Sequence, residues 1–288
     1  VDKDPKYIAK CKRNSAGTDF EGHEFFEAAS MRKINGKYYF IYSSFLGHEL
    51  CYAIGDSPDG EFRYGGTIVS IGDVGLNGRT CPKNAANYTG NTHGSIVEAC
   101  GKYYVFYHRQ TNRHCFSRQA CAEEITINPD GSIPHVEVTS CGLNGGPLKG
   151  KGEYEARIAC QLFSAKGCRF YSVFRGFEGS HPYFTQTGED REGDGDQYIA
   201  NMRDGATAGF KYFDFEGASD VTVRVRGDAS GRMVVFAEEG EPAAFVKISP
   251  SKDYTDFSAP LKISDGVHAL YFRFEGKGRL DFDKFTLK

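Results

Sequence analysis

Apolar and polar residues alternate over short stretches along the whole chain, and turn residues separate these stretches. Residues 49–54 and 66–71 are two examples, with a Ser-Pro-Asp-Gly turn at 57–60 between them. A period near two with frequent turns is typical of β-strands, and no segment has the three-to-four-residue period of a long amphipathic helix. The pattern therefore predicts an all-β protein.

One part of the pattern occurs twice. Residues 30–42 (SMRKINGKYYFIY) return as residues 95–107 (SIVEACGKYYVFY), with each matched position displaced by 65 residues. Each copy predicts a strand, a tight turn at Asn35-Gly36 or Cys100-Gly101, and a second strand, which together form a β-hairpin. Several short strands in each repeat favour the blades of a β-propeller. A β-sandwich that contains two similar hairpins is the alternative.

The pattern changes towards the C-terminus. Residues 124–127 and 133–138 flank a turn and predict one more hairpin, and the glycine-rich residues 142–152 are interpreted as a linker. More regular strands are expected after it, at 221–226, 232–237, 244–248, 267–274 and 280–287. Regular strands with Gly, Asp and Ser turns predict a β-sandwich of the jelly-roll type. We therefore expect a partial β-propeller over residues 1–145 and a β-sandwich over residues 150–288.

Composition and charge narrow the classes of partner. The 288 residues carry a formal charge of −3 and a pI near 6.3, without a basic stripe, so neither nucleic acid nor an anionic membrane is expected as a partner. No apolar run approaches the roughly 18 residues of a membrane span. The nine cysteines form no C-x-x-C pair. This favours free thiols in a reducing or anaerobic setting, and leaves both a bacterial cytoplasm and secretion open.

Glu27 is the candidate catalytic residue. It lies between Phe26 and a pair of alanines, directly before the first copy of the repeat. The inner strands of a propeller end at a central pocket, where burial would raise the pKa of a carboxyl group and so suit it to be a general acid. The alternative is a surface glutamate in an acidic stretch with Glu21 and Glu24. The corresponding segment before the second copy contains His93.

The motifs around these residues resemble a known family. Residues 25–33 (FFEAASMRK) with 36–39 (GKYY) resemble the blade of glycoside hydrolase family 43 that carries the catalytic acid. Residues 91–95 (NTHGS) with 107–109 (YHR) resemble a later blade of the same propeller. The resemblance implies a five-bladed propeller that hydrolyses β-xylosidic or α-L-arabinofuranosidic bonds with inversion.

The resemblance also implies roles for single residues. Glu27 matches the general acid, and Phe26 is its neighbour in the substrate-binding site. His93 matches a histidine on the propeller axis that binds calcium directly or through water, and Arg109 matches a residue that lines the sugar subsite. A core role for His93 and a structural role for Arg109 stay open. No organic cofactor is implied.

The second carboxyl group of an inverting enzyme is missing from the matched segments. Inversion needs two carboxyl groups about 6.5–9.5 Å apart, and nothing in the chain matches the family's base aspartate or the aspartate that tunes the acid. At a repeat of 65 residues, residues 1–145 make little more than two blades. We therefore expect the first blades to come from an upstream segment, a separate piece of chain or a second copy.

The C-terminal region resembles family 6 carbohydrate-binding modules. The matched residues are 204–214, 266–271 and 280–283. Such modules stack sugars on exposed aromatic side chains, usually including tryptophan, and this chain has no tryptophan. Tyr183, Tyr198 and Tyr212 are the candidates in its place, with packing as the alternative. The resemblance also implies a calcium site that involves Asp283.

The expected partner is therefore a pentose-containing oligosaccharide or polysaccharide, and the first hypothesis is a glycoside hydrolase. A non-catalytic carbohydrate-binding protein, or an inactive hydrolase fragment, is the alternative that the missing base favours. The sequence does not distinguish xylose from arabinose.

Overall fold

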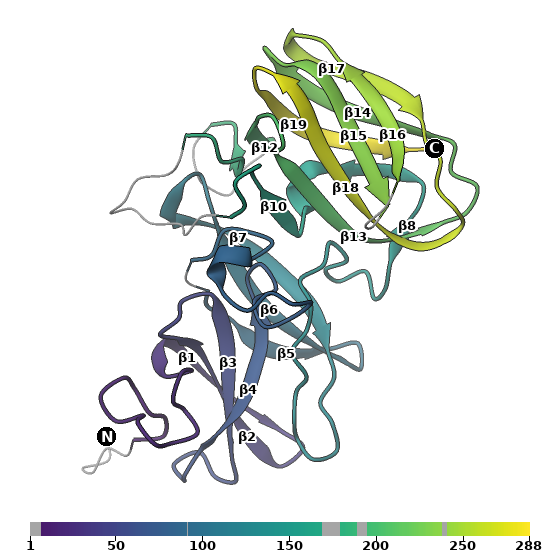
Figure 1. The fold of residues 1–288 in the computed structure, drawn as a ribbon. Helices are drawn as coiled ribbons and strands as arrows, with labels where there is room; N and C mark the ends of the chain where they lie inside the picture. Colours follow the sequence, from purple (N-terminus) through teal and green to yellow (C-terminus); the bar gives the residue numbers. More distant parts are fainter. Residues whose placement is uncertain (1–6, 91, 169–178, 189–194, 238–240) are drawn as a thin grey trace.

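The fold was obtained as a computed structural model, which describes residues 7–90, 92–168, 179–188, 195–237 and 241–288 (Figure 1). Two blade-like sheets in the N-terminal half are followed by a β-sandwich in the C-terminal half. Within these ranges the helical elements are two three-residue 3₁₀ turns, Pro82–Asn84 and Ala156–Ile158. The predicted all-β class, with propeller blades before a sandwich, is confirmed. Over the same ranges no helix has the length and apolar character needed to cross a membrane.

Both N-terminal sheets are antiparallel meanders, the usual form of a propeller blade. The first has four strands in sequence order: β1 (Phe25–Ile34), β2 (Lys37–Ser44), β3 (Glu49–Gly55) and β4 (Arg63–Ser70). The second has three: β5 (Ser95–Ala99), β6 (Lys102–Thr111) and β7 (His114–Ile125).

The sequence repeat corresponds to equivalent hairpins in the two blades. In each hairpin both turn residues have positive φ, 50° and 82° at Asn35 and Gly36, and 53° and 76° at Cys100 and Gly101. Two left-handed residues define a type I′ turn, whose twist matches that of the paired strands. The two copies also touch, because the hydroxyls of Ser30 and Ser95 lie 2.8 Å apart.

A shared apolar core lies between the two blades. Tyr39, Ile41, Leu50 and Tyr52 of the first blade meet Ile96, Val105 and Tyr107 of the second, and all are at least 96% buried. The outer face of the second blade is more open, with Val97 42% and Phe106 38% exposed. The blades therefore pack through one face of each sheet.

The predicted hairpin over residues 124–138 is wrong. Strand β7 ends at Ile125, and residues 133–138 do not pair with it. Val136 instead forms an isolated parallel bridge with Val69 of the first blade. Pro134 has no N–H to donate to a ladder, and the Tyr52 hydroxyl accepts the N–H of Ile133 at 2.8 Å. The segment therefore fills the space between the blades.

The sandwich consists of two six-stranded sheets. One contains β8 (Leu148–Lys149), β10 (Gln161–Phe163), β13 (Thr207–Phe215), β15 (Ser230–Ala237), β16 (Pro242–Ile248) and β18 (Gly266–Lys277). The other contains β9 (Gly152–Glu155), β11 (Tyr183–Gln186), β12 (Gln197–Met202), β14 (Asp220–Gly227), β17 (Ser251–Pro260) and β19 (Leu280–Leu287). Strand β8 lies in the predicted linker and β9 begins at its last residue, Gly152, so the second half of this glycine-rich stretch already belongs to the sandwich.

Phenylalanines fill the interior of the sandwich in place of tryptophan. The rings of Phe272 and Phe285 lie 4.8 Å apart, and Phe210 lies 4.8 Å from Phe285. Each aromatic pair of this kind adds about 0.5–1.5 kcal/mol beyond the burial of its area.

The β6–β7 hairpin joins the blades to the sandwich. At its tip the N–H of Asn112 donates to the carbonyl oxygen of Phe184 on β11 at 2.8 Å. In Figure 1 this hairpin lies between the two lobes of the molecule. The second blade is therefore anchored directly to one sheet of the sandwich.

Candidate active site

Glu27 and His93 meet where the two blades adjoin. The Oε1 atom of Glu27 lies 2.9 Å from Nε2 of His93. Glu27 lies in the first part of β1, and His93 lies two residues before β5, the equivalent strand of the repeat. Their side chains are 39% and 34% exposed, respectively. The two residues are thus in contact, but the described residues bury Glu27 only in part.

A β-bulge shapes the backbone next to Glu27. Pairing between β1 and β2 shifts register on both sides of Glu27, and Ala28 has a φ of 64°. The left-handed conformation costs an L-residue such as alanine about 1–2 kcal/mol. Bulges of this kind redirect side chains at the edges of sheets and next to active sites. The irregular start of β1 thus determines where the Glu27 carboxyl points.

A second histidine and an arginine extend the pair. The ring centroid of His108 on β6 lies 5.1 Å from that of His93, and Arg118 on β7 donates to His108 Nε2 at 3.3 Å. Burial lowers the pKa of His108 to about 4, and the charges of Arg118 and His93 act in the same direction. His108 is therefore neutral at neutral pH, with its proton on the buried Nδ1.

Arg109 does not join this cluster, and its contacts favour the structural role that the sequence left open; a place in the sugar subsite stays a prediction. Alternation along β6 sends Arg109 to the face opposite His108. Its guanidinium is buried and donates to the carbonyl oxygens of Ala159 and Arg157 and to Gln119 Oε1. It also lies 3.7 Å from the ring centroid of Phe184. Arg109 is a structural residue between the blade and the sandwich.

Sequence analysis missed Arg118, which lies next to the Glu27–His93 pair through His108. The pairing of strands β6 and β7 in a hairpin was the feature of the sequence that could have indicated Arg118. Its register pairs His108 with Ala120 and Gln110 with Arg118, so His108 and Arg118 share a face.

Phe26 lies on an exposed apolar rim beside Glu27. It is 53% exposed and packs edge-to-face against Phe45, with ring centroids 5.7 Å apart. Phe45 and Leu46 are themselves about half exposed. An accessible aromatic edge next to the carboxyl suits the sugar contact expected of Phe26, which stays a prediction.

Among the residues that the structure describes, the side chains at His93 do not supply the oxygen ligands of a calcium ion. Calcium takes six to eight oxygen ligands, whereas the groups gathered here are one carboxyl, a second imidazole and, beyond it, a guanidinium. Asp283 faces Arg224, whose Nε lies 3.4 Å from the carboxylate. A calcium ion at Asp283 stays a prediction, and no step is derived through calcium.

A different carboxyl group has a raised pKa. Burial raises the pKa of Glu123 to about 7. Hydrogen bonds from Thr139 and Tyr107 favour the ionised form and lower the pKa, but burial has the larger effect. Glu123 is paired with Val105 on β6 and so lies on the opposite face from His108. It lines a cavity of about 280 Å³. Sequence analysis did not single it out, because its burial depends on the segment around Thr139.

The sandwich carries an open cleft of about 720 Å³. Tyr183, Tyr198, Arg226 and Asp281 line it, together with Arg113 from the tip of the β6–β7 hairpin. The Arg226 guanidinium lies 5.0 Å from the Tyr198 ring centroid, and its Nε donates to Asp281 at 3.1 Å. Two of the three candidate tyrosines therefore share one cleft.

Tyr212, the third candidate tyrosine, lies elsewhere. Its hydroxyl donates to Glu137 at 2.6 Å, where the blades meet the sandwich. It is therefore separate from the cleft that holds the other two.

Comparison with known proteins gives three informative matches. A xylosidase/arabinosidase of Thermoclostridium stercorarium is 48% identical over 296 residues, which cover 100% of this chain and 61% of that protein. The structure of a glycoside hydrolase family 43 arabinoxylan arabinofuranohydrolase of Bacillus subtilis, in complex with cellotetraose, matches 92% of this chain and 54% of its own (19% identity, TM-score 0.48). A family 6 carbohydrate-binding module of Clostridium cellulolyticum, in complex with xylose, matches 49% of this chain and 99% of its own (15% identity, TM-score 0.38). No protein-family model matches the chain.

Fold and site together define a two-lobed all-β protein, in which propeller blades carrying a carboxyl–imidazole pair precede a β-sandwich. Along its whole length the chain is similar to a protein named xylosidase/arabinosidase. It spans about three fifths of the Thermoclostridium protein, 61% of its length.

We expect Arg109→Met to destabilise the protein by about 3 kcal/mol, because it leaves two buried carbonyl oxygens without their charged donor. Urea unfolding measures the change. Arg118→Met is the matched control, since Arg118 is exposed, and it should change the free energy of unfolding by less than about 0.5 kcal/mol. Equal effects of the two substitutions would contradict the structural role of Arg109.

Glu123 should make stability depend on pH. Because the folded state holds its proton more tightly than the unfolded state, the free energy of unfolding falls as pH rises from about 4.5 to about 7. The isosteric, non-titrating Glu123→Gln variant lacks this loss, which amounts to at most about 3 kcal/mol. Urea unfolding of both proteins between pH 4.5 and 8 gives the difference. Parallel pH profiles would show that Glu123 has an ordinary pKa.

Proposed function

We propose that this chain supplies the general-acid side of the active site of an inverting glycoside hydrolase that acts on β-xylosidic or α-L-arabinofuranosidic bonds of plant polysaccharide. The contact between Glu27 and His93, at the bulged start of β1, is the observation that carries the proposal. Similarity over the full length of the chain to a protein named xylosidase/arabinosidase supports the substrate class.

The chemistry assigned to Glu27 is protonation of the leaving oxygen. The His93 imidazole lies 2.9 Å from the Glu27 carboxyl and orients it. In the reactive form Glu27 carries a proton and delivers it to the glycosidic oxygen as the bond breaks. Neutral His108 adds no positive charge beside this carboxyl, and the Arg118 guanidinium can donate to sugar hydroxyls.

The base is proposed to come from propeller blades outside these 288 residues. Inversion needs a second carboxylate about 6.5–9.5 Å from the acid to activate water. The partial exposure of Glu27 and of the outer face of the second blade, at Val97 and Phe106, supports this arrangement. Further blades, from the same polypeptide, a separate piece or a second copy, would cover these surfaces.

Glu27→Gln in the complete propeller should lower kcat on natural arabinoxylan oligosaccharides by about 10²–10⁴-fold, because the leaving oxygen then departs without a proton. The loss should be much smaller on aryl β-xylosides and aryl α-L-arabinofuranosides, whose leaving groups need little protonation. Steady-state kinetics on both substrate classes measures the contrast. Glu21→Gln, on an exposed neighbouring acid, is the control. Unchanged turnover of the natural substrate would refute the assignment.

Carbohydrate binding by the sandwich is a second candidate function, favoured by the cleft that Tyr183 and Tyr198 line. A cleft with aromatic rings, a guanidinium and a carboxylate offers both stacking and hydrogen bonds to a sugar. This function needs no second carboxyl group, so the isolated chain could perform it.

Tyr198→Ala should weaken binding of xylo-oligosaccharides by about tenfold, since removing one aromatic contact costs roughly 1–2 kcal/mol. Isothermal titration calorimetry of the isolated chain measures it. Phe245→Ala is the matched control, because Phe245 is half exposed on the other sheet. If both variants bind xylo-oligosaccharides as tightly as the unmodified chain, the ligand does not bind in the cleft that Tyr198 lines. Absence of any binding, with hydrolysis present, would leave only the catalytic function.

A further inference from the structure

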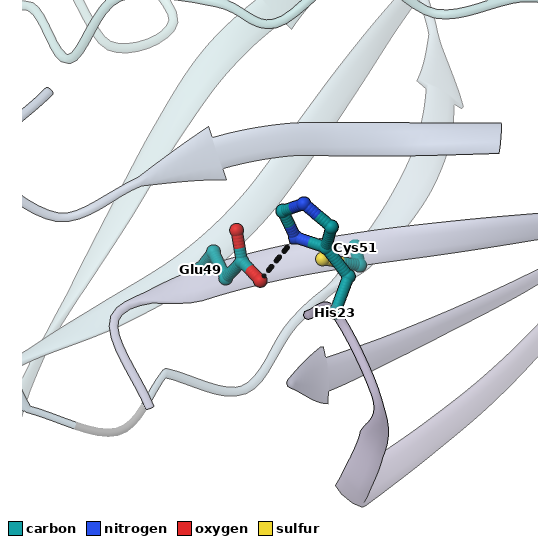
Figure 2. A group of neighbouring side chains, drawn as sticks. All are labelled: His23, Glu49 and Cys51. Atoms are coloured by element: carbon teal, nitrogen blue, oxygen red, sulfur yellow. Dashed lines mark hydrogen bonds and ion pairs between the residues drawn. The ribbon is translucent and has the colours of Figure 1, made fainter. Parts of the chain in front are cut away.

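A second cluster of reactive side chains lies on the first blade, apart from Glu27. Glu49 and Cys51 are two positions apart on β3 and share a face of the sheet, and His23 reaches them from the turn before β1 (Figure 2). One ligand atom from each residue lies within 4.8 Å of the other two. No other group of three or more His, Cys, Asp or Glu residues with metal-binding spacing occurs in the described part of the chain.

The proposed hydrolase chemistry does not use this cluster. Cys51 belongs to an apolar core with Phe20, Phe40 and Phe62, on the face of the first blade opposite the shared core of the two blades. Glu27 and His93, in contrast, bridge the two blades. The cluster therefore needs an explanation of its own.

The surrounding contacts hold the three side chains in place. His23 Nδ1 lies 2.8 Å from Glu49 Oε1, the contact drawn in Figure 2, and the His23 ring stacks on Tyr64 with centroids 4.8 Å apart. The Thr67 hydroxyl donates to Glu49 Oε2 at 2.9 Å and lies 3.7 Å from Cys51 Sγ. Such outer contacts orient the ligands of metal sites.

The charges also favour a cation. The hydrogen bond to Glu49 raises the pKa of His23. Burial raises the pKa of the Cys51 thiol, and the negative charge of the Glu49 carboxylate raises it further. Glu49 is 97% buried, and its pKa lies below the ordinary value because hydrogen bonds from His23, Ser44 and Thr67 outweigh burial. Without a metal, the cluster holds a carboxylate in contact with an imidazole, beside a neutral thiol.

We propose that His23, Glu49 and Cys51 bind a divalent transition-metal ion of the zinc class, with a water molecule in the fourth position. One nitrogen, one oxygen and one sulfur ligand suit such an ion, and bonds of about 2.0–2.3 Å place tetrahedral ligand atoms about 3.5 Å apart. The ligand atoms lie within 4.8 Å of one another, so the widest spacing needs to shorten by about 1.3 Å at most. The His23 side chain is 37% exposed, which provides the entry side.

Binding releases protons in a defined number. The ion displaces one proton from the Cys51 thiol and one from the His23 imidazolium, and the resulting site of M²⁺, thiolate, carboxylate and neutral imidazole has no net charge. Release should be about two protons per ion below the pKa of His23 and about one above it.

Cobalt(II) tests the proposal, with the 288-residue chain prepared without a polyhistidine tag. One equivalent of Co²⁺ should produce a thiolate-to-cobalt charge-transfer band in the near ultraviolet, and Zn²⁺ should displace it. Cys51→Ser should abolish the band and weaken metal binding by at least about 100-fold, since even outer contacts are worth about 10–100-fold. Cys100→Ser, on an exposed turn cysteine, should keep both.

Two results would overturn the proposal. One is cobalt binding without a thiolate band, and the other is a band that Cys100→Ser removes as fully as Cys51→Ser does. Should Cys51→Ser fail to fold, proton release from the unmodified chain decides. Release of about two protons per ion at acidic pH supports the site, and release near zero excludes it.

Discussion

The two-residue period of strand β6 separates the chemistry of this protein from its assembly. Consecutive side chains, His108 and Arg109, point to opposite faces of the second blade. His108 packs beside His93 and accepts a hydrogen bond from Arg118. Arg109 points towards the sandwich and donates to carbonyl oxygens there. Strand β6 therefore has two roles. One face places His108 near Glu27, and the other face anchors the blade to the sandwich.

Local patterns predicted most of the architecture. The alternation of apolar and polar residues, and the Asn35-Gly36 and Cys100-Gly101 turns, predicted the hairpins, because the type I′ turn is decided by two residues. Residues 133–138 were predicted wrongly, since their partner is Val69 on the other blade and not their neighbour in sequence. Local pattern does not determine a non-local pairing of this kind.

The candidate site shows the same limit. The motif around Glu27 located the carboxyl, and the 65-residue repeat placed His93 one position beyond the equivalent of Glu27 in the second copy. The resemblance named Arg109, whereas Arg118 is the arginine that contacts His108 beside the Glu27–His93 pair. Distinguishing Arg109 from Arg118 requires the β6–β7 register and the position of the sandwich, neither of which a motif contains. The His23, Glu49 and Cys51 cluster was missed for a related reason, since one member is distant in sequence from the other two.

The tip of the β6–β7 hairpin links the two lobes thermodynamically. Arg113 comes from the blade, yet it lies 5.4 Å from the Tyr183 ring centroid and forms part of the wall of the sandwich cleft. A ligand that touches this guanidinium binds the docked arrangement more tightly than the separated one. The two effects are reciprocal. If contact between the blade and the sandwich makes ligand binding in the cleft more favourable, ligand binding makes that contact more favourable by the same free energy. Under the carbohydrate binding proposed for the cleft, a bound sugar would thus stabilise the position of the blades relative to the sandwich.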